Sequence, residues 1–147
     1  MTDQPTSAPA IDGTRTVVLR IPARAEYITL CRLALTGLAQ LRGIGDDTMA
    51  DLKLALTEAV SNSVRHAYAP AGDGHVEITY CLRREAVVIE VVDDGAGFDP
   101  DEAPSFNGGE LSEGGLGIAI IRTIADELEI ESKPGTRGSR LRFVKNF

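Results

Sequence analysis

Three polar residues, Glu58, Asn62 and His66, recur at four-residue steps along the segment "LALTEAVSNSVRHAY" (residues 54–68). In an α-helix each such step turns by only about 40°, so the three side chains form one slowly turning row. The row borders the arc that should pack inward, which carries Leu52, Leu56, Ala59, Ser63 and Ala67. A carboxylate, an amide and an imidazole at the edge of the core would give a ligand pocket a polar wall. The alternative is an ordinary polar rim in which His66 has satisfied hydrogen bonds.

A second candidate is the aspartate that ends the segment "AVVIEVVD". Strand alternation places Val87, Ile89, Val91 and Asp93 on one face, so the carboxylate continues an inward row of apolar residues. A buried carboxylate needs a hydrogen-bond donor, and the amino group of a bound purine would supply one. Alternatively, Asp93 is the first residue of a turn. The spacing of an EF-hand calcium loop is missing here.

Glycines precede the next helical pattern, in "EGGLGIAIIRTIAD" (residues 113–126). Gly114, Gly115 and Gly117 would let backbone N–H groups at the helix start face phosphate oxygens. Glycines also begin helices for reasons of packing. The segment is not a Walker A loop, because it lacks the Gly-Lys-Ser/Thr ending.

The elements that must position these residues follow from periodicity. We expect a loose leader over residues 1–14 and one domain over residues 15–147. The pattern predicts strands at 15–21, 75–82, 86–93, 128–132 and 139–147. It predicts one helix at 25–43 that ends in a cap at Gly43, a second that begins at Asp46 or Asp47 as cap and ends at Tyr68, and a third at 115–128. This order predicts an α+β two-layer sandwich, a mixed but mostly antiparallel sheet with helices on one face.

Residues 94–114 are predicted to form a long loop without secondary structure, rich in glycine, proline and acids. A loop of this length inside a compact domain is uncommon unless it works as a lid or binding segment. The glycines gather at both ends of the loop, so we expect hinges there.

Composition narrows the class of protein. The net charge of −7 argues against a general nucleic-acid binder, which would need Lys and Arg to neutralise phosphates. No apolar run approaches the length of a membrane span, and residues 1–14 do not resemble a signal peptide. We therefore expect a soluble, cytoplasmic protein without membrane or direct nucleic-acid contact. Cys31 and Cys81 lack metal or redox spacing and are expected to be reduced, buried thiols.

Taken in order, the three segments resemble the nucleotide boxes of the GHKL ATPases, a superfamily that includes gyrase, histidine kinases and mismatch-repair ATPases. Within it, "EAVSNSVRHAY", "DDGAGFDP" and "SEGGLGIAIIRTIADELEI" resemble the anti-sigma factor serine-protein kinases of bacterial partner-switching systems. The resemblance runs from about residue 16 to the C terminus. It implies that the protein has a histidine-kinase-like ATPase fold, binds ATP or ADP with Mg2+, and acts as a protein-serine kinase.

The resemblance also implies roles for single residues. Asn62 would coordinate Mg2+ through its side-chain oxygen, and Glu58 would be the general base. Asp93 would receive the adenine amino group in a turn containing Gly95 and Gly97. His66 would support the helix end rather than react.

At the other end of the site, Gly115 and Gly117 would contact the phosphates, within a binding segment that also includes Gly114 and Leu116. A Gly-Thr pair opens the last strand in the family, and Ser139 would take the place of that threonine. An alternative alignment uses Gly135 and Thr136 instead.

The resemblance implies two partners. A sigma factor would be held in one state, and a STAS-domain anti-anti-sigma protein would be phosphorylated in the other; a homodimer is also implied.

One departure from the family pattern is that residues 99–113 contain no Lys or Arg, where some relatives place a basic residue against the terminal phosphate. Arg122 or the basic stretch 133–147 would have to compensate. A nucleotide-dependent binding switch with little kinase activity is the alternative function. A detached histidine-kinase catalytic domain fits less well, because the chain has no phosphoacceptor helix pair.

Overall fold

The computed structural model describes residues 15–67, 74–97, 99–101, 106–107, 110–111, 113–133 and 135–147; the predicted leader lies outside them. The elements are β1 (Arg15–Pro22), the 3-10 turn η2 (Ala25–Tyr27), α1 (Ile28–Gln40), α2 (Asp46–Ala67), β2 (His75–Leu82), β3 (Ala86–Asp93), β4 (Phe106–Asn107), β5 (Glu110–Leu111), α3 (Glu113–Ile124), β6 (Glu127–Glu131) and β7 (Ser139–Asn146).

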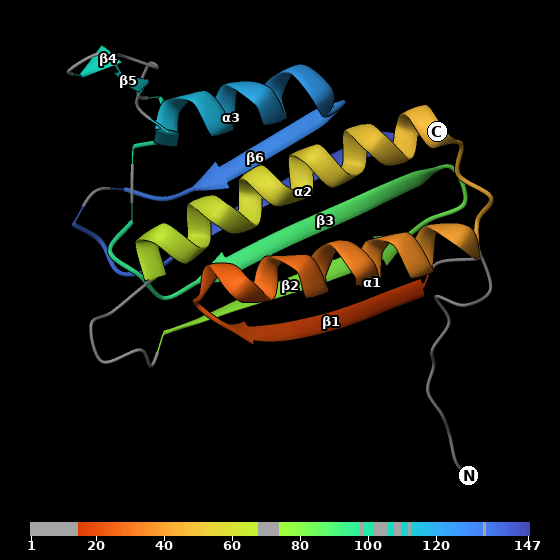
Figure 1. Ribbon diagram of the computed structural model, residues 1–147, viewed down its shortest axis with the longest axis horizontal. Helices are drawn as coiled ribbons and strands as arrows, with labels where there is room; N and C mark the ends of the chain where they lie inside the picture. Colours follow the sequence, from red (N-terminus) through yellow and green to blue (C-terminus); the bar gives the residue numbers. More distant parts are fainter. Residues whose placement is uncertain are drawn as a thin grey trace, which may run out of the picture.

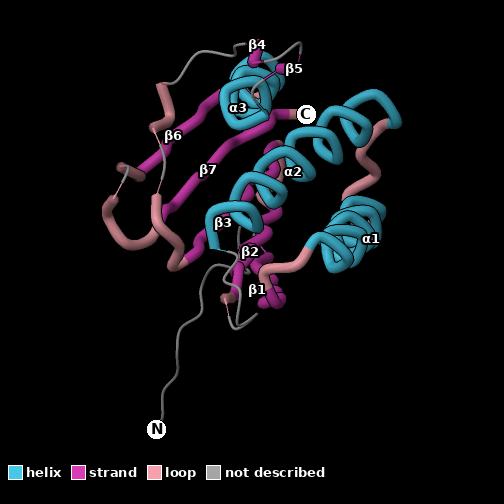
Figure 2. The backbone as a smooth tube through the Cα atoms, turned by 60° about the vertical axis from the view of Figure 1, so that its left-hand side comes forward, coloured by secondary structure: helices cyan, strands magenta, loops and turns pink. Residues whose placement is uncertain are grey.

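Five strands form one sheet in the order β1-β2-β3-β7-β6, and each neighbouring pair is antiparallel. Figure 1 shows the three α-helices in front of this sheet, with α1 over β1 and β2 and α3 over β6. The turned view in Figure 2 agrees that the helices lie on one side. The predicted two-layer α+β sandwich is confirmed, and its described sheet is wholly antiparallel.

The core lies between the two layers, where apolar residues of the helices meet alternate residues of the strands. The predicted inward arc of α2 is confirmed, since Leu52, Leu56, Ala59, Ser63 and Ala67 are all buried. The side chain of Tyr80 in β2 extends to α1, and its hydroxyl donates a 2.8 Å hydrogen bond to the carbonyl oxygen of Cys31. This bond satisfies a buried polar group.

The two thiols have different surroundings. Cys31 is buried, and burial raises the pKa of its thiol to about 11. Cys81 is only partly buried on the strand face away from the helices, so the expectation that both thiols are buried is wrong for Cys81. The structure has no disulfide between them.

Several predicted boundaries shift for local reasons. Gly43 adopts a φ of 66° and follows α1; its N–H donates to Gln40 while Ile44 donates to Ala39, the pattern of a Schellman ending. Gly45, not an aspartate, precedes α2 and accepts from Met49. Asp46 and Asp47 lie inside the first turn, where their charge favours the helix dipole.

The third helix ends at Ile124 rather than continuing to residue 128. The side chain of Lys145 donates to the Ile124 carbonyl at 3.1 Å, and the N–H of Asp126 donates to the Val144 carbonyl. Pairing with β7 therefore overrides the helical pattern of the segment "ADEL". Within the predicted loop 94–114, β4 and β5 form a two-stranded hairpin, so the loop is not free of secondary structure.

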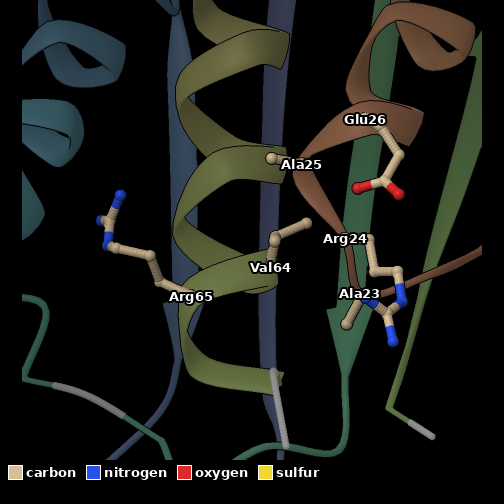
Figure 3. Close-up of a pocket in the computed structure, with 6 residues that line it drawn as sticks. All are labelled: Ala23, Arg24, Ala25, Glu26, Val64 and Arg65. Atoms are coloured by element: carbon tan, nitrogen blue, oxygen red, sulfur yellow. The ribbon is translucent and has the colours of Figure 1, made fainter. Parts of the chain in front are cut away.

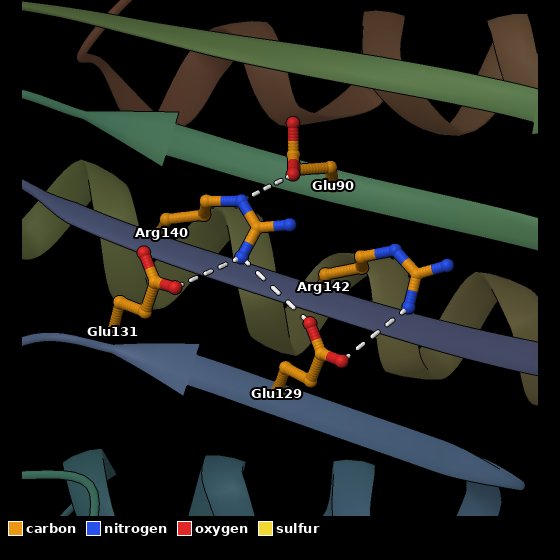
Figure 4. Close-up of polar contacts among 5 residues, drawn as sticks. All are labelled: Glu90, Glu129, Glu131, Arg140 and Arg142. Atoms are coloured by element: carbon orange, nitrogen blue, oxygen red, sulfur yellow. Dashed lines mark hydrogen bonds and ion pairs between the residues drawn. The ribbon is translucent and has the colours of Figure 1, made fainter.

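The sheet face away from the helices is polar around Arg140 (Figure 4). Arg140 forms ion pairs with Glu90, Glu129 and Glu131, and Arg142 contacts Glu129 at 4.0 Å. The interleaved Leu141 and Phe143 are buried toward the helices, as the alternation predicts. Both arginines therefore belong to a partly solvated strand face.

Candidate functional site

The polar row of α2 lies at the edge of the core, as its spacing predicts. Asn62 is only 2% exposed, whereas Glu58 and His66 are partly buried. The Oδ1 atom of Asn62 accepts a 3.2 Å hydrogen bond from Nη2 of Arg65, one turn further along the helix. The sequence pattern did not single out Arg65, although its spacing of three residues from Asn62 places the two side chains on neighbouring parts of the helix surface.

Asp93 ends β3 on the helix-facing side of the sheet and is 5% exposed. Its Oδ1 atom accepts from the N–H of Gly95 at 2.8 Å, so the turn interpretation is confirmed. Its Oδ2 atom accepts from the Ser139 hydroxyl at 2.6 Å. A carboxylate offers about four acceptor positions, so these two bonds leave capacity for a ligand donor.

Ser139 and Thr136, the two hydroxyl residues considered for the same role, occupy different places. Ser139 begins β7 directly opposite Asp93 in the strand register and is buried. Thr136 is exposed, and its hydroxyl donates to the carbonyl of Lys133 at 2.6 Å. The geometry therefore supports the alignment that uses Ser139.

The turn after β3 joins the Asp93 end of the sheet to the end of α2. The N–H of Ala96 donates to the His66 carbonyl at 3.2 Å, and a side chain at Gly95 would come within 1.9 Å of that same oxygen. Gly97 has a φ of 80° and would place a Cβ atom 2.2 Å from the Lys133 carbonyl. Only glycine fits both constraints at position 97. The backbone carbonyl of His66 thus holds the turn, while the role of its side chain stays a prediction.

Helix α3 lies beside the Glu58 end of the polar row. Contrary to the prediction that they precede the helix, Gly114, Gly115 and Gly117 lie within α3. The N–H groups of a first helical turn have no partner inside the helix, so those of Gly114 and Gly115 suit an anion. Gly117 lies one turn later, and a Cβ atom there would be 2.9 Å from the Oε1 atom of Glu58. The structure therefore shows Gly117 allowing close approach to Glu58; its phosphate contact stays a prediction.

The donor set fits an adenine nucleotide with Mg2+. Asp93 and Ser139 offer a buried acceptor and a hydroxyl at one end, and the first turn of α3 offers amide groups at the other. Mg2+ prefers oxygen ligands and in nucleotide sites uses few protein groups beside the phosphates, so a single amide oxygen of Asn62 is suitable. In the described part of the chain, no group of three or more His, Cys, Asp or Glu residues could hold a metal by itself.

The compensating role suggested for Arg122 has little support. Arg122 lies in the last turn of α3, about 10 Å along the helix axis from Gly115, and its Nη2 atom is 3.8 Å from Asp101. Arg140 and Arg142 of β7 project from the opposite sheet face. Arg65, by contrast, contacts Asn62 in the polar row of α2.

A family profile for the histidine kinase-like ATPase domain matches residues 21–145, which include the α2 row, Asp93 and Ser139. The chain belongs to the histidine kinase-like ATPase family. Among curated relatives of this ATPase, the serine-protein kinase RsbW of Bacillus velezensis is 33% identical over 136 residues, covering 87% of this chain and 85% of the relative. RsbW of Bacillus subtilis is 32% identical with the same coverage, and RsbW of Listeria monocytogenes is 34% identical over 78% of each chain.

The resemblance to the serine-protein kinase group is thereby confirmed. A solved Mycobacterium tuberculosis structure containing RsbU and RsbW domains superimposes with a TM-score of 0.65 at 21% identity, covering 90% of this chain and 32% of that one. This likeness confirms the ATPase fold. Across the described residues, every helix is too short or too polar to span a lipid bilayer.

Proposed function

We propose that this member of the ATPase family is an ATP- and Mg2+-dependent protein-serine kinase and a cytoplasmic anti-sigma factor. It would hold a sigma factor in one state and phosphorylate a STAS-domain anti-anti-sigma protein in the other. The observation that carries the proposal is that the turn after Asp93 bonds to the helix that carries Glu58 and Asn62 in one row, while Ser139 bonds to Asp93 itself. The similarity to RsbW serine-protein kinases over most of both chains supports the partner-switching role.

The chain's own residues divide the work of phosphoryl transfer. Asp93 would orient the adenine, and Asn62 would hold the metal, which would supply positive charge against the phosphates. Glu58 would accept the hydroxyl proton of the substrate serine as the serine oxygen bonds to phosphorus and the bond to the ADP oxygen breaks. The absence of a side chain at Gly117 leaves room for one side of the Glu58 carboxylate.

A nucleotide-dependent binding switch with little kinase activity is the second candidate. The acidic residues of segment 99–113 favour this second candidate, because the segment carries no Lys or Arg and would repel a terminal phosphate. In this case ATP and ADP would change the affinity for the partners, but no phosphate would move.

The test is to incubate the protein with radiolabelled ATP, Mg2+ and a STAS protein encoded beside it. Label on a serine of the STAS protein is the expected result. Nucleotide-dependent binding of the STAS protein without labelling would favour the switch, and the absence of both would contradict the proposal. The anti-sigma role is tested by co-purification. The protein should co-purify with a sigma factor in the presence of ATP, and it should not do so after addition of the unphosphorylated STAS protein.

We also propose that two copies associate through β1 and α1. Strand β1 is an edge of the sheet and carries Val17 and Val18, which are 39% and 55% exposed, and α1, which lies over β1, carries Leu30 and Leu33, which are 46% and 62% exposed. The opposite edge strand β6 instead carries Glu127, Glu129 and Glu131, which discourage pairing. Two β1 edges could pair about a twofold axis and cover their own apolar residues.

Sedimentation velocity tests this dimer. Leu33→Lys is expected to shift the protein toward monomer, whereas Leu54→Lys, on the exposed side of α2, should leave the dimer intact. A wild-type monomer at all concentrations, or a dimer unaffected by Leu33→Lys, would contradict the proposal.

A further inference from the structure

Helix α2 has different neighbours on its two flanks. On the flank toward η2, a hollow of about 350 Å³ lies beside Val64 in the last turns of the helix (Figure 3). On the other flank α2 packs against α3, and Glu58, the proposed general base, lies on this side. A misplacement of about 1 Å can slow a reaction by about 100-fold. The contacts between α2 and α3 therefore bear directly on the placement of the base.

Two contacts between α2 and α3 lie two helical turns apart. A Cβ atom at Gly117 would lie 2.9 Å from Oε1 of Glu58, so the backbone of α3 runs beside this carboxylate. Seven residues away on each helix, Asp51 of α2 and the carbonyl of Ile124 in α3 contact the same side chain, Lys145 of β7. Seven residues span about 10.5 Å in either helix, so the two contacts have equal spacing on α2 and on α3. The helices thus lie antiparallel and in register over this length.

Lys145 joins both helices to the sheet. It follows Phe143 on the helix-facing side of β7, and its side chain is 20% exposed. The Nζ atom donates to the Ile124 carbonyl at 3.1 Å and lies 3.9 Å from Oδ2 of Asp51. A cation at the C-terminal end of a helix is stabilised by the helix dipole and by carbonyls that have no partner inside the helix. Lys145 therefore holds the end of α3 close to both α2 and β7.

The backbone of β7 holds the residues after α3 independently of Lys145. The N–H of Asp126 donates to the Val144 carbonyl at 2.8 Å, and Oδ2 of Asp126 accepts from the N–H of Asn146 at 2.6 Å. These bonds fix the start of β6 on the sheet and do not reach α2. Loss of the Lys145 side chain should therefore loosen α3 from α2 without unfolding the sheet.

We infer that Lys145 is a positioning residue for phosphoryl transfer, because it holds α3 against α2 and so keeps the α3 backbone beside the Glu58 carboxylate. The inference rests on the proposed function and deepens it. A neighbouring backbone restricts the orientations of the Glu58 side chain, which otherwise rotates freely about several bonds. Asp93 and Asn62 lie on β3 and α2, so the proposed adenine and metal contacts do not depend on Lys145.

Hydrogen exchange of the full chain without nucleotide tests the hold on α3. Lys145→Met removes the charge and the donor but keeps an unbranched side chain. We expect the amides of residues 118–124 to exchange about 10-fold faster in this variant, and those of β2 and β3 to keep their wild-type rates. Lys145→Arg should stay near the wild type. Lys53→Met is the matched control, because Lys53 lines a hollow between α1 and α2 on the other flank; it should leave α3 unchanged.

Single-turnover phosphorylation of a STAS partner tests the effect on the base. At saturating ATP, Lys145→Met should transfer phosphate about 10-fold more slowly, while its ATP affinity changes by less than about 3-fold. Lys145→Arg should regain most of the transfer. The deciding comparison is the double variant of Lys145→Met with Glu58→Gln. It should be no slower than Glu58→Gln alone, because Lys145 acts through this carboxylate.

Wild-type exchange of α3 in Lys145→Met would overturn the inference. A full 10-fold loss on adding Lys145→Met to Glu58→Gln would also overturn it, because the effect would then not pass through the base. If Lys145→Met does not fold, Asp51→Asn removes only the facing charge and should show smaller changes in the same direction; its wild-type behaviour in both assays would contradict the inference. Each of these results with an active wild type leaves the proposed function in place. A wild type that transfers no phosphate would contradict the proposed function and, with it, this role of Lys145.

Discussion

Ser139 donates a 2.6 Å hydrogen bond to Oδ2 of Asp93, across the antiparallel pair formed by β3 and β7. The bond joins residues separated by 46 positions and holds the Asp93 carboxylate at the helix-facing end of the sheet. With Oδ1 held by the N–H of Gly95, the carboxylate has one fixed orientation. A fixed acceptor at this place is what recognition of a purine amino group requires.

The first prediction concerns this hydroxyl. Ser139→Ala removes a donor to Asp93 and should weaken ATP binding by about 3- to 10-fold, because an intramolecular hydrogen bond contributes about 1 kcal/mol. Ser139→Thr keeps the hydroxyl and should bind nearly as the wild type does. Thr136→Ala is the control, since its hydroxyl serves only the neighbouring loop. If Thr136→Ala weakens binding and Ser139→Ala does not, the alternative alignment is right.

Asp93→Asn tests the adenine contact directly. An amide that presents its NH2 group would face the adenine amino donor, and loss of a charged acceptor should cost about 1.5 to 3 kcal/mol of binding. Titration with ATP and with GTP measures this. Normal ATP affinity in the variant would place the adenine elsewhere, provided that thermal melting shows a folded protein.

The metal role of Asn62 predicts that Asn62→Ala abolishes the Mg2+ dependence of ATP binding. The residue is the one protein ligand proposed for the metal, so its loss removes the link between protein, metal and phosphates. Calorimetry with and without Mg2+ is the measurement. Asn62→Asp is a useful partner variant, because it keeps an oxygen ligand. Wild-type affinity and Mg2+ dependence in Asn62→Ala would rule out the assignment.

Gly117→Ala should separate stability from catalysis. The added methyl group would meet Oε1 of Glu58, the far end of a flexible side chain, so the fold can adjust by moving the carboxylate. Alanine favours a helix over glycine by about 0.5 to 1 kcal/mol, so thermal stability should not fall. Phosphoryl transfer should fall while ATP binding persists. Gly37→Ala, where nothing lies within 4 Å, should gain stability without losing transfer; equal transfer in both variants would contradict a positioning role for Gly117.

Local patterns predicted much of the fold. Alternation in "AVVIEVVD" was sufficient to place Asp93 on the buried face, and the four-residue spacing in α2 was sufficient to place Asn62 at the edge of the core. Both depend on the geometry of a single element, which the order of residues determines. The GHKL resemblance added the residue roles, which periodicity alone could not supply.

Features that depend on distant partners were not predictable in the same way. The end of α3 at Ile124 is set by hydrogen bonds from β7, and the segment "ADEL" by itself still has a helical pattern. The choice between Ser139 and Thr136 needed the strand register. The contact of Arg65 with Asn62 depends on a side-chain rotamer, so the sequence showed only that the two residues could meet.

The central claim, that Glu58 is the general base of a protein-serine kinase, is tested most directly by single-turnover phosphorylation of a STAS partner by Glu58→Gln, alongside an ATP titration. The amide is nearly isosteric, so the variant should fold and bind ATP and any sigma partner normally. Transfer should be slower by about 10² to 10⁴ fold, the usual contribution of a positioned base. Undiminished transfer by Glu58→Gln would contradict the account, and no transfer by the wild type across plausible STAS partners would favour the binding switch.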